Sequence, residues 1–353
     1  MASTKGFKNN FTLLTAFLLP FTNYLMQYYY LIILFIFSHN LLTAQTLPPQ
    51  PLSGPGGRNY PHETIRITDR ADKADGFWTF EPASPAVDSA HVVVFLHGYG
   101  AINPMIYGGW LEHLVRKGNI VIYPRYQKGI FPPGTRRFAD RVVAGIHKAL
   151  DTLSNGDHTI PITDNFSIVG HSYGGALAAN LAAKYQEYQL PKPVAVLLCS
   201  PGTGPFRGAI LDSYKNIPTD TKLLVMVSEK DQTVGDKLGK KIFTTAKNTT
   251  AKNLILQRQD RRYQDRDIRA GHNESYSIDN RLDIGKRTLV TRRAKNVSRR
   301  DAVDYFGYWK LLDALHSCTR NGNYCDYAIG NTFEQRFMGY WSDGMPVVPL
   351  KIK

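Results

Sequence analysis

A strand, a serine flanked by glycines and a helix follow one another without a break between residues 166 and 185. Phe166–Val169 is a short apolar run typical of a buried strand, and Ala176–Tyr185 has the alanine- and leucine-rich composition of a helix. Between them lies GHSYGG, residues 170–175, with Ser172 as its serine. A G-x-S-x-G pattern in this setting predicts a nucleophile elbow, a tight turn that exposes the serine hydroxyl. The alternative is a glycine-rich turn whose serine has no role.

The rest of the chain alternates strand and helix patterns. Repeated strand–helix units predict an α/β fold, with a mostly parallel central sheet covered by helices on both faces. An antiparallel pair at Thr64–Ile67 and Phe77–Phe80 is expected to precede it. Further strands are expected at His91–Leu96, Ile120–Tyr123, Val194–Leu198, Leu223–Val227 and Leu254–Leu256, and further helices at Met105–Arg116, Phe138–Leu153, Val234–Ala246 and Ala302–Leu315.

An exposed serine needs an orienting acid and a base, because its free hydroxyl is a weak nucleophile. After an elbow of this kind the acid precedes the histidine in the chain. Asp231 comes just past the strand that ends at residue 227, which makes it the preferred acid. Glu229 and Asp236 are nearby substitutes, and Asp231 would also suit a helix N-cap.

Two histidines follow Asp231 in the chain. His316 falls inside the last expected helix, so a structural role is expected for it. His272 lies in a loop after the strand at residues 254–256 and is the expected base. His171 is interpreted only as the variable residue of the elbow.

An oxyanion that forms at the attacked carbonyl needs two backbone N–H donors. Tyr173 directly follows the serine and is expected to supply one. The second is expected from Tyr99, in the HGYG segment at residues 97–100 that follows the strand His91–Leu96. The alternative is that HGYG forms only a tight turn.

Over residues 60–320 the chain resembles the α/β-hydrolase superfamily. The resemblance rests on FLHGYG at 95–100, GHSYGG at 170–175, SEKD at 228–231 and GHN at 271–273. It implies a Ser172–Asp231–His272 triad with a Tyr99/Tyr173 oxyanion hole, and it requires neither a metal nor an organic cofactor. Within the superfamily the chain is most similar to secreted esterases, lipases and cutinase-like polyester hydrolases.

The expected function is therefore hydrolysis of carboxylic esters through an acyl-enzyme intermediate. A peptidase or an acyltransferase with the same triad is the first alternative, and a non-catalytic secreted binding protein is the second. The substrate is expected to be a small-molecule, lipid or polymeric ester. Only about 25 residues separate the strands Val194–Leu198 and Leu223–Val227, which leaves no room for the helical cap that many relatives carry there. An open cleft is expected in consequence.

Positive charge is concentrated around the expected base. Residues 258–300 hold 13 Lys and Arg against 6 Asp and Glu, in a chain of net charge +14. This basic segment is a candidate for attracting anionic substrates or surfaces. The alternative is a solvated loop whose arginines pair with Asp260, Asp265, Asp267 and Asp283. Nucleic-acid binding is not expected, because no nucleic-acid module is recognised.

The first 45 residues have the pattern of a secretory signal peptide. Two lysines precede an apolar run of about ten residues, and Thr43 and Ala44 provide the small residues expected at a cleavage site. An N-terminal membrane anchor is the alternative. The expected organisation is a signal peptide at 1–45, a linker rich in proline and glycine at 46–60, and one hydrolase domain at 61–353 with an aromatic C-terminal extension that packs on it.

The three cysteines fit a secreted or periplasmic location. Cys318 and Cys325 flank a turn-rich segment and are expected to form a disulfide in an oxidising compartment. Cys199 lies in an apolar run and is expected to be a buried free thiol. No CxxC pair or Cys/His cluster has the spacing of a zinc site.

Overall fold

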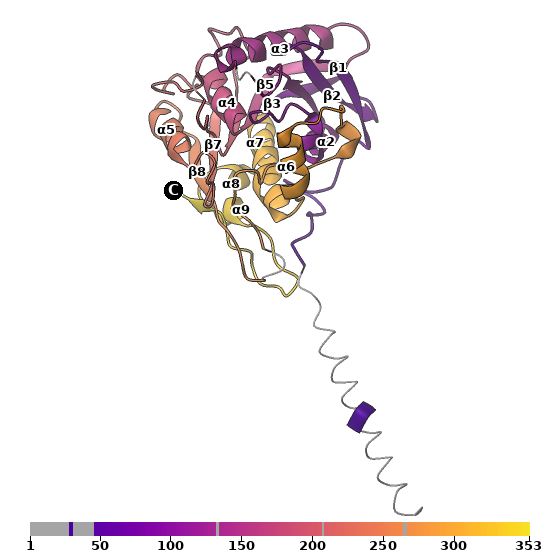
Figure 1. Ribbon diagram of the computed structural model, residues 1–353, viewed down its shortest axis with the longest axis vertical. Coiled ribbons are helices and arrows are strands. Elements are labelled where there is room, and N and C mark those ends of the chain that lie inside the picture. Colours follow the sequence, from indigo (N-terminus) through magenta and orange to yellow (C-terminus); the bar gives the residue numbers. More distant parts are fainter. Residues whose placement is uncertain (1–27, 31–45, 132–133, 207, 264–266) are drawn as a thin grey trace, which may run out of the picture. The chain divides into compact units, whose positions relative to one another are not determined.

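The computed structural model describes residues 28–30, 46–131, 134–206, 208–263 and 267–353. The expected signal peptide lies outside these residues except for one helical stretch at 28–30. Residues 47–353 form one compact unit (Figure 1). It includes residues 47–60, predicted to be a linker; there the Gly56 N–H donates to the Asp313 carboxylate over 2.8 Å. None of the helices within the described ranges has the length and apolarity needed to span a bilayer.

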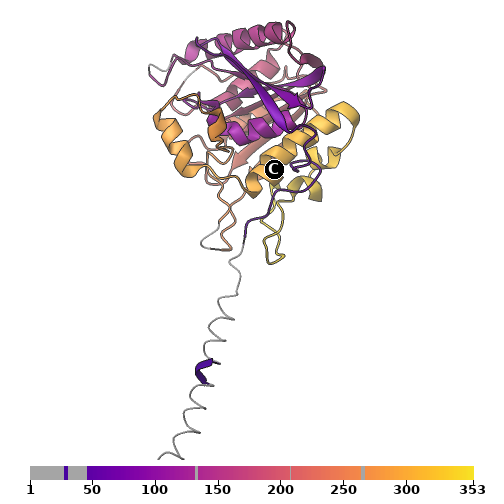
Figure 2. The ribbon, with the colours of Figure 1, turned by 90° about the vertical axis from the view of Figure 1, so that its right-hand side faces the viewer.

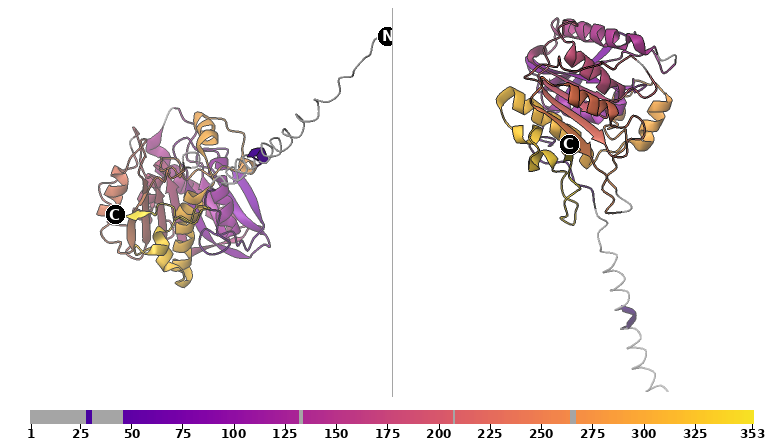
Figure 3. Two further views of the ribbon diagram at one scale, coloured as in Figure 1. Left: turned by 90° about the horizontal axis from the view of Figure 1, so that it is seen from below. Right: turned by 90° about the vertical axis from the view of Figure 1, so that its left-hand side faces the viewer.

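The core of this unit is a nine-stranded sheet, counted over the described residues, in the order β1-β2-β4-β3-β5-β6-β7-β8-β9. The strands from β3 to β8 pair in parallel, whereas β1, β2 and β9 pair antiparallel with their neighbours. Figure 2 turns the β1 edge toward the viewer, and the right panel of Figure 3 shows the β9 edge. The strands are β1 Thr64–Arg70, β2 Phe77–Ser84, β3 Ser89–Leu96, β4 Asn119–Pro124, β5 Ile160–His171, β6 Ala195–Cys199, β7 Lys222–Ser228, β8 Lys252–Gln257 and β9 Lys351–Ile352.

Helices cover both faces of the sheet because its strands are apolar on both sides. Successive residues of β3 point to opposite faces, so Val93 and Phe95 join one core cluster while Val92 and Val94 join the other. The first cluster is closed by α2 and α7, and the second by α3, α4 and α5 (Figure 1). The helices are α2 Gly108–Arg116, α3 Phe138–Leu153, α4 Tyr173–Ala183, α5 Lys237–Thr245, α6 Leu289–Val297, α7 Trp309–Asn321, α8 Cys325–Ala328 and α9 Phe333–Arg336.

This architecture is the α/β-hydrolase fold, as predicted. The segment between β6 and β7 holds no helix or strand among its described residues, so no large cap is inserted there. Four of the helices and strands named above were not predicted from the sequence, namely α6 in the basic segment, the short helices α8 and α9, and the short edge strand β9. The last long helix also differs, since a π-helical stretch at Val303–Tyr308 leads into α7 and the helix continues to Asn321.

The C-terminal segment that follows α7 packs on the rest of the unit. The Lys310 ammonium on α7 donates to the backbone carbonyls of Glu334, Gln335 and Phe337. Trp341 is buried, and its indole N–H donates to the Asp260 carboxylate over 3.1 Å. These bonds connect the extension both to the last long helix and to the loop that follows β8.

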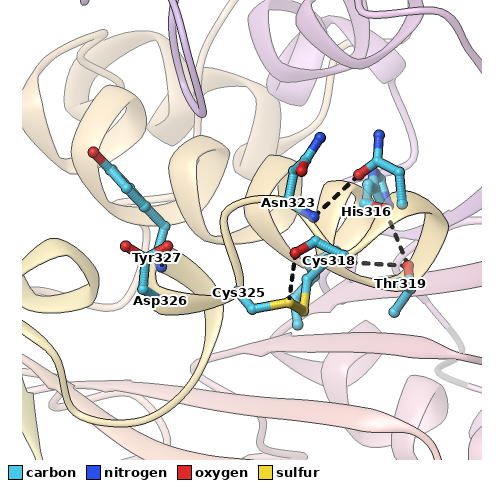
Figure 4. Close-up of a disulfide and its surroundings, with 10 residues drawn as sticks. His316, Cys318, Thr319, Asn323, Cys325, Asp326 and Tyr327 are labelled. Atoms are coloured by element: carbon cyan, nitrogen blue, oxygen red, sulfur yellow. Dashed lines mark hydrogen bonds between the residues drawn. A yellow bond between two sulfur atoms is a disulfide. The ribbon is translucent and has the colours of Figure 1, made fainter.

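The cysteines are arranged as predicted. Cys318, near the end of α7, is joined by a disulfide to Cys325 at the start of α8 (Figure 4). The bridge closes the turn between the two helices. Cys199 is a fully buried free thiol on β6, and burial raises its pKa well above the usual value.

Candidate active site

Ser172 occupies a strained turn between β5 and α4. Its φ of 56° and ψ of −121° are rare for a residue with a side chain. The turn is possible because its neighbours are glycines: a Cβ on Gly170 would lie 2.3 Å from the Gly174 carbonyl oxygen, and one on Gly174 would lie 2.2 Å from the Leu96 carbonyl oxygen. The chain therefore forms the sharp strand–turn–helix geometry that the GHSYGG sequence predicts.

The structure brings the three expected polar side chains into one line. The Ser172 Oγ lies 2.8 Å from His272 Nε2, and His272 Nδ1 lies 2.7 Å from Asp231 Oδ2. The side chains of His272 and Asp231 are 7% and 0% exposed. Since Nδ1 faces a carboxylate, it carries the proton in the neutral ring, and Nε2 is left as an acceptor for the serine hydroxyl.

Backbone hydrogen bonds hold the acid in place. Besides His272, the Asp231 carboxylate accepts the N–H groups of Thr233 and Val234 through Oδ1, at 2.9 and 3.0 Å. Burial raises the pKa of Asp231, but these hydrogen bonds and the His272 ring outweigh burial, so the pKa lies below its usual value. The Lys230 N–H donates to the Ala270 carbonyl and thereby joins the acid loop to the histidine loop.

The other candidates for acid and base have different partners and do not hydrogen-bond to Ser172 or His272 through their side chains in the described residues. Glu229 accepts the backbone N–H of Gln259, and Asp236 forms ion pairs with Lys240 and Lys353. His316 is buried in α7, as expected for a structural histidine, and the low-polarity surroundings keep its pKa well below the usual value.

The HGYG loop lies directly against the elbow. A Cβ on Gly98 would come within 3.3 Å of the Ser172 Cβ, a tight contact that would force the neighbouring side chains to shift by a few tenths of an ångström. The loop is fixed on both sides, because the Gly98 N–H donates to the Tyr107 hydroxyl and the Gly100 N–H donates to the Gln127 side chain. The Tyr99 N–H between them donates to no acceptor within the described residues.

A buried relay that the sequence did not reveal connects this loop to the histidine loop. The Tyr107 hydroxyl accepts the Gly98 N–H over 2.9 Å and donates to His171 Nδ1 over 2.8 Å. His171 Nε2 in turn donates to the His272 carbonyl over 2.8 Å. Burial, together with the nearby His272 ring, lowers the pKa of His171 to about 3, so this ring is neutral. His171 was interpreted as a variable residue, but it makes structural contacts on both sides.

A cavity of about 200 Å³ opens beside Ser172 and His272. Tyr99 and Phe206 form one wall, with ring centroids 4.1 Å apart, and Tyr276 belongs to another. Further lining residues come from the loops after β6 and β7 and from α6, which contributes Val290 and Arg293. No signal in the sequence indicated Phe206, Tyr276, Val290 or Arg293, because their proximity to Ser172 depends on how distant segments pack.

Part of the basic segment is neutralised by ion pairs. Arg287 pairs with Asp283 over 2.8 Å and Arg299 pairs with Asp267 over 3.2 Å, as the solvated-loop alternative predicts. Asp260 differs from that expectation: its carboxylate accepts N–H groups from Arg262, Trp341 and Val348 and forms no ion pair with an arginine in the described residues. Asp265, the fourth expected partner, lies outside the described residues. Across the ranges that the structure describes, no cluster of three or more His, Cys, Asp or Glu side chains is arranged to hold a metal ion.

Comparison with known proteins supports the α/β-hydrolase fold and a broad class of activity, ester cleavage. A family model described as chlorophyllase matches residues 72–212, which is less than half of the chain. The matched part contains the HGYG loop and the elbow with Ser172, but ends before Asp231 and His272. That family lies in the α/β-hydrolase superfamily, so the match indicates an ester-cleaving hydrolase. A comparison with curated proteins finds no match.

Proposed function

We propose that the chain is a serine hydrolase that cleaves carboxylic esters through an acyl-enzyme intermediate. The observation that carries the proposal is the line of hydrogen bonds from Ser172 through His272 to Asp231, next to an apolar cavity. Nucleophile, base and orienting acid are the three groups that acyl transfer by a serine requires. The chlorophyllase match supports the ester class.

In the proposed reaction His272 removes the Ser172 proton as Oγ attacks the ester carbonyl, and Asp231 stabilises the imidazolium that forms. The N–H groups of Tyr99 and Tyr173 hold the oxyanion, helped by the N-terminus of α4, where Tyr173 is the first residue. His272 then protonates the leaving alcohol. Water attacks the acyl-enzyme by the same route, which releases the acid and restores Ser172.

Export into an oxidising compartment is part of the proposal. The Cys318–Cys325 disulfide supports it, because such bonds persist mainly outside reducing compartments. A signal peptide at residues 1–45 would direct this export, and N-terminal sequencing of the secreted protein would test it. A mature chain that begins near residue 46 is the expected result, whereas a retained N-terminus would favour the membrane-anchor alternative.

The test of function is hydrolysis of 4-nitrophenyl esters with acyl chains from C2 to C16 by the wild-type protein and by Ser172→Ala. Chlorophyll is included as a bulky ester, since the matched family is described as chlorophyllase and no large cap is inserted between β6 and β7. We expect turnover in the wild type, and a fall of at least 1,000-fold in Ser172→Ala. Equal activity in the two proteins would refute the assignment of Ser172, and an inactive wild type would bring peptidase substrates and the binding-protein alternative forward.

A further inference from the structure

The cavity beside Ser172 carries one unpaired positive charge. Arg293 lines it and is exposed to solvent, yet it forms no ion pair or hydrogen bond with any described residue. No aspartate or glutamate is among the described residues that line it. Apart from His272 and this guanidinium, the cavity is formed by neutral and mostly apolar groups.

The position of Arg293 is fixed by helix α6. Val290, one turn earlier on the same side of the helix, also lines the cavity. The Val290 Cγ2 packs against the HGYG loop. It lies so close to Gly100 that a Cβ added there would be only 2.8 Å from this methyl group. Thr288 caps the helix by accepting the Thr291 N–H, and Ala294 is buried beneath it. The base of the Arg293 side chain is therefore held at the cavity on a rigid element.

The charge of Arg293 acts inside the cavity. Burial raises the pKa of Tyr276, and the nearby Arg293 guanidinium partly offsets that effect. Other arginines of the basic segment are used differently: Arg281, for example, pairs with Asp279 and Glu112. Arg293 thus differs from its paired neighbours in facing the cavity with its hydrogen-bond donors available.

We propose that Arg293 is a specificity-determining residue that binds a carboxylate carried by the ester substrate. The inference rests on the proposed ester hydrolysis and names its substrate class, acidic esters. A guanidinium offers paired donors that match the two oxygens of a carboxylate. The carboxylate belongs either to the acyl part, as in a half-ester of a dicarboxylic acid, or to the alcohol part, as in an ester of a hydroxy acid.

Two matched substrate pairs test the inference and separate these sources. Mono-4-nitrophenyl adipate against 4-nitrophenyl hexanoate places the charge on the acyl side; shorter half-esters are avoided because their own carboxylate attacks the ester. 4-Acetoxybenzoate against its methyl ester places the charge on the alcohol side. The readout is the ratio of kcat/KM for the anionic substrate to that for the neutral one, so a general loss of activity in a variant cancels.

We expect Arg293→Gln to lower this ratio about ten-fold for one pair, the size of a charge-assisted hydrogen bond at a partly exposed site. Arg292→Gln is the matched control, because Arg292 is an exposed neighbour outside the cavity lining, and it should leave the ratio within two-fold. Added salt should raise the wild-type KM for the anionic ester and have less effect on the neutral one.

The failure of this inference differs from a failure of the proposed function. If neutral esters are cleaved through Ser172 but Arg293→Gln leaves both ratios unchanged, the carboxylate-binding role is wrong while ester hydrolysis stands. Equal changes in Arg292→Gln and Arg293→Gln would also overturn it, since they indicate only the general field of the basic segment. If no ester is cleaved at all, the proposed function itself has failed.

Discussion

Replacing Tyr107 with phenylalanine removes one fully buried hydroxyl that bonds to both sides of the site. Gly98 N–H would lose its acceptor and His171 Nδ1 its donor, at 2.9 and 2.8 Å in the native chain. Each buried polar group left without a partner costs about 1–3 kcal/mol. We therefore expect Tyr107→Phe to lower the free energy of unfolding by about 2–6 kcal/mol.

Activity should fall for a separate reason. Without its Tyr107 partner the His171 ring is free to reorient, and it then no longer holds the His272 carbonyl, while the HGYG loop loses its Gly98 anchor. Displacements of about 1 Å in a catalytic group cost up to roughly 100-fold in rate. Because Tyr107 does not line the cavity, the expected result is a kcat lower by roughly ten- to 100-fold with little change in KM.

The assay combines urea unfolding with steady-state hydrolysis of 4-nitrophenyl butyrate. Tyr214→Phe is the matched control, because it also removes a fully buried hydroxyl that accepts a backbone N–H, from Leu211, but in the other core cluster and outside the cavity lining. It should lose stability and keep its kcat. If Tyr107→Phe behaves in the same way, with kcat within two-fold of the wild type, the relay only stabilises the fold and our reasoning about positioning is refuted.

Two further predictions concern the elbow and the C-terminal extension. Gly174→Ala should abolish activity, because its Cβ would lie 2.2 Å from the Leu96 carbonyl oxygen, whereas Gly307→Ala, whose nearest neighbour would be 3.5 Å away, should stay active in the same ester assay. Burial lowers the pKa of the Lys310 ammonium from 10.5 to about 7. Between these pKa values the unfolded chain binds more protons than the folded chain, so the free energy of unfolding should rise with pH, by up to about 1.4 kcal/mol per pH unit. Urea unfolding at pH 7 and pH 9 should show this rise in the wild type and a smaller one in Lys310→Met; equal slopes would contradict it.

The sequence predicted the sheet well because buried parallel strands leave a local signal. Runs such as residues 92–96 and 166–169 are apolar on both faces, and the structure places both in the centre of the sheet. The edge strand β9 was missed because it is only two residues long and pairs with β8 across about 95 positions of the chain. Helix α6 was missed because it has few apolar residues among its arginines and lysine, so its sequence shows no clear apolar face. Its buried side can be identified only from its packing on the HGYG loop.

The candidate site likewise contains residues that the sequence predicted and residues that it did not. Ser172, Asp231 and His272 were predicted because each follows a strand and their order along the chain is characteristic. The groups that surround them, among them Tyr107 and Arg293, have no such local pattern. Their roles depend on contacts between segments that are far apart in the sequence, and these contacts exist only after the chain has folded.

The strain at Ser172 shows how the surrounding fold supports the site. A positive φ in a residue with a side chain costs on the order of 1–3 kcal/mol and persists only where neighbouring packing enforces it. Here the last six residues of β5 and all of α4, which flank the serine, are buried, and Gly170 and Gly174 allow the backbone segments to approach more closely than a Cβ would permit. The same packing buries the Tyr107–His171 relay, whose polar groups are tolerable in the core only because each has a partner. Local strain and a satisfied buried network therefore depend on one another, and a variant that releases either should loosen the hydrogen-bonded line from Ser172 to Asp231.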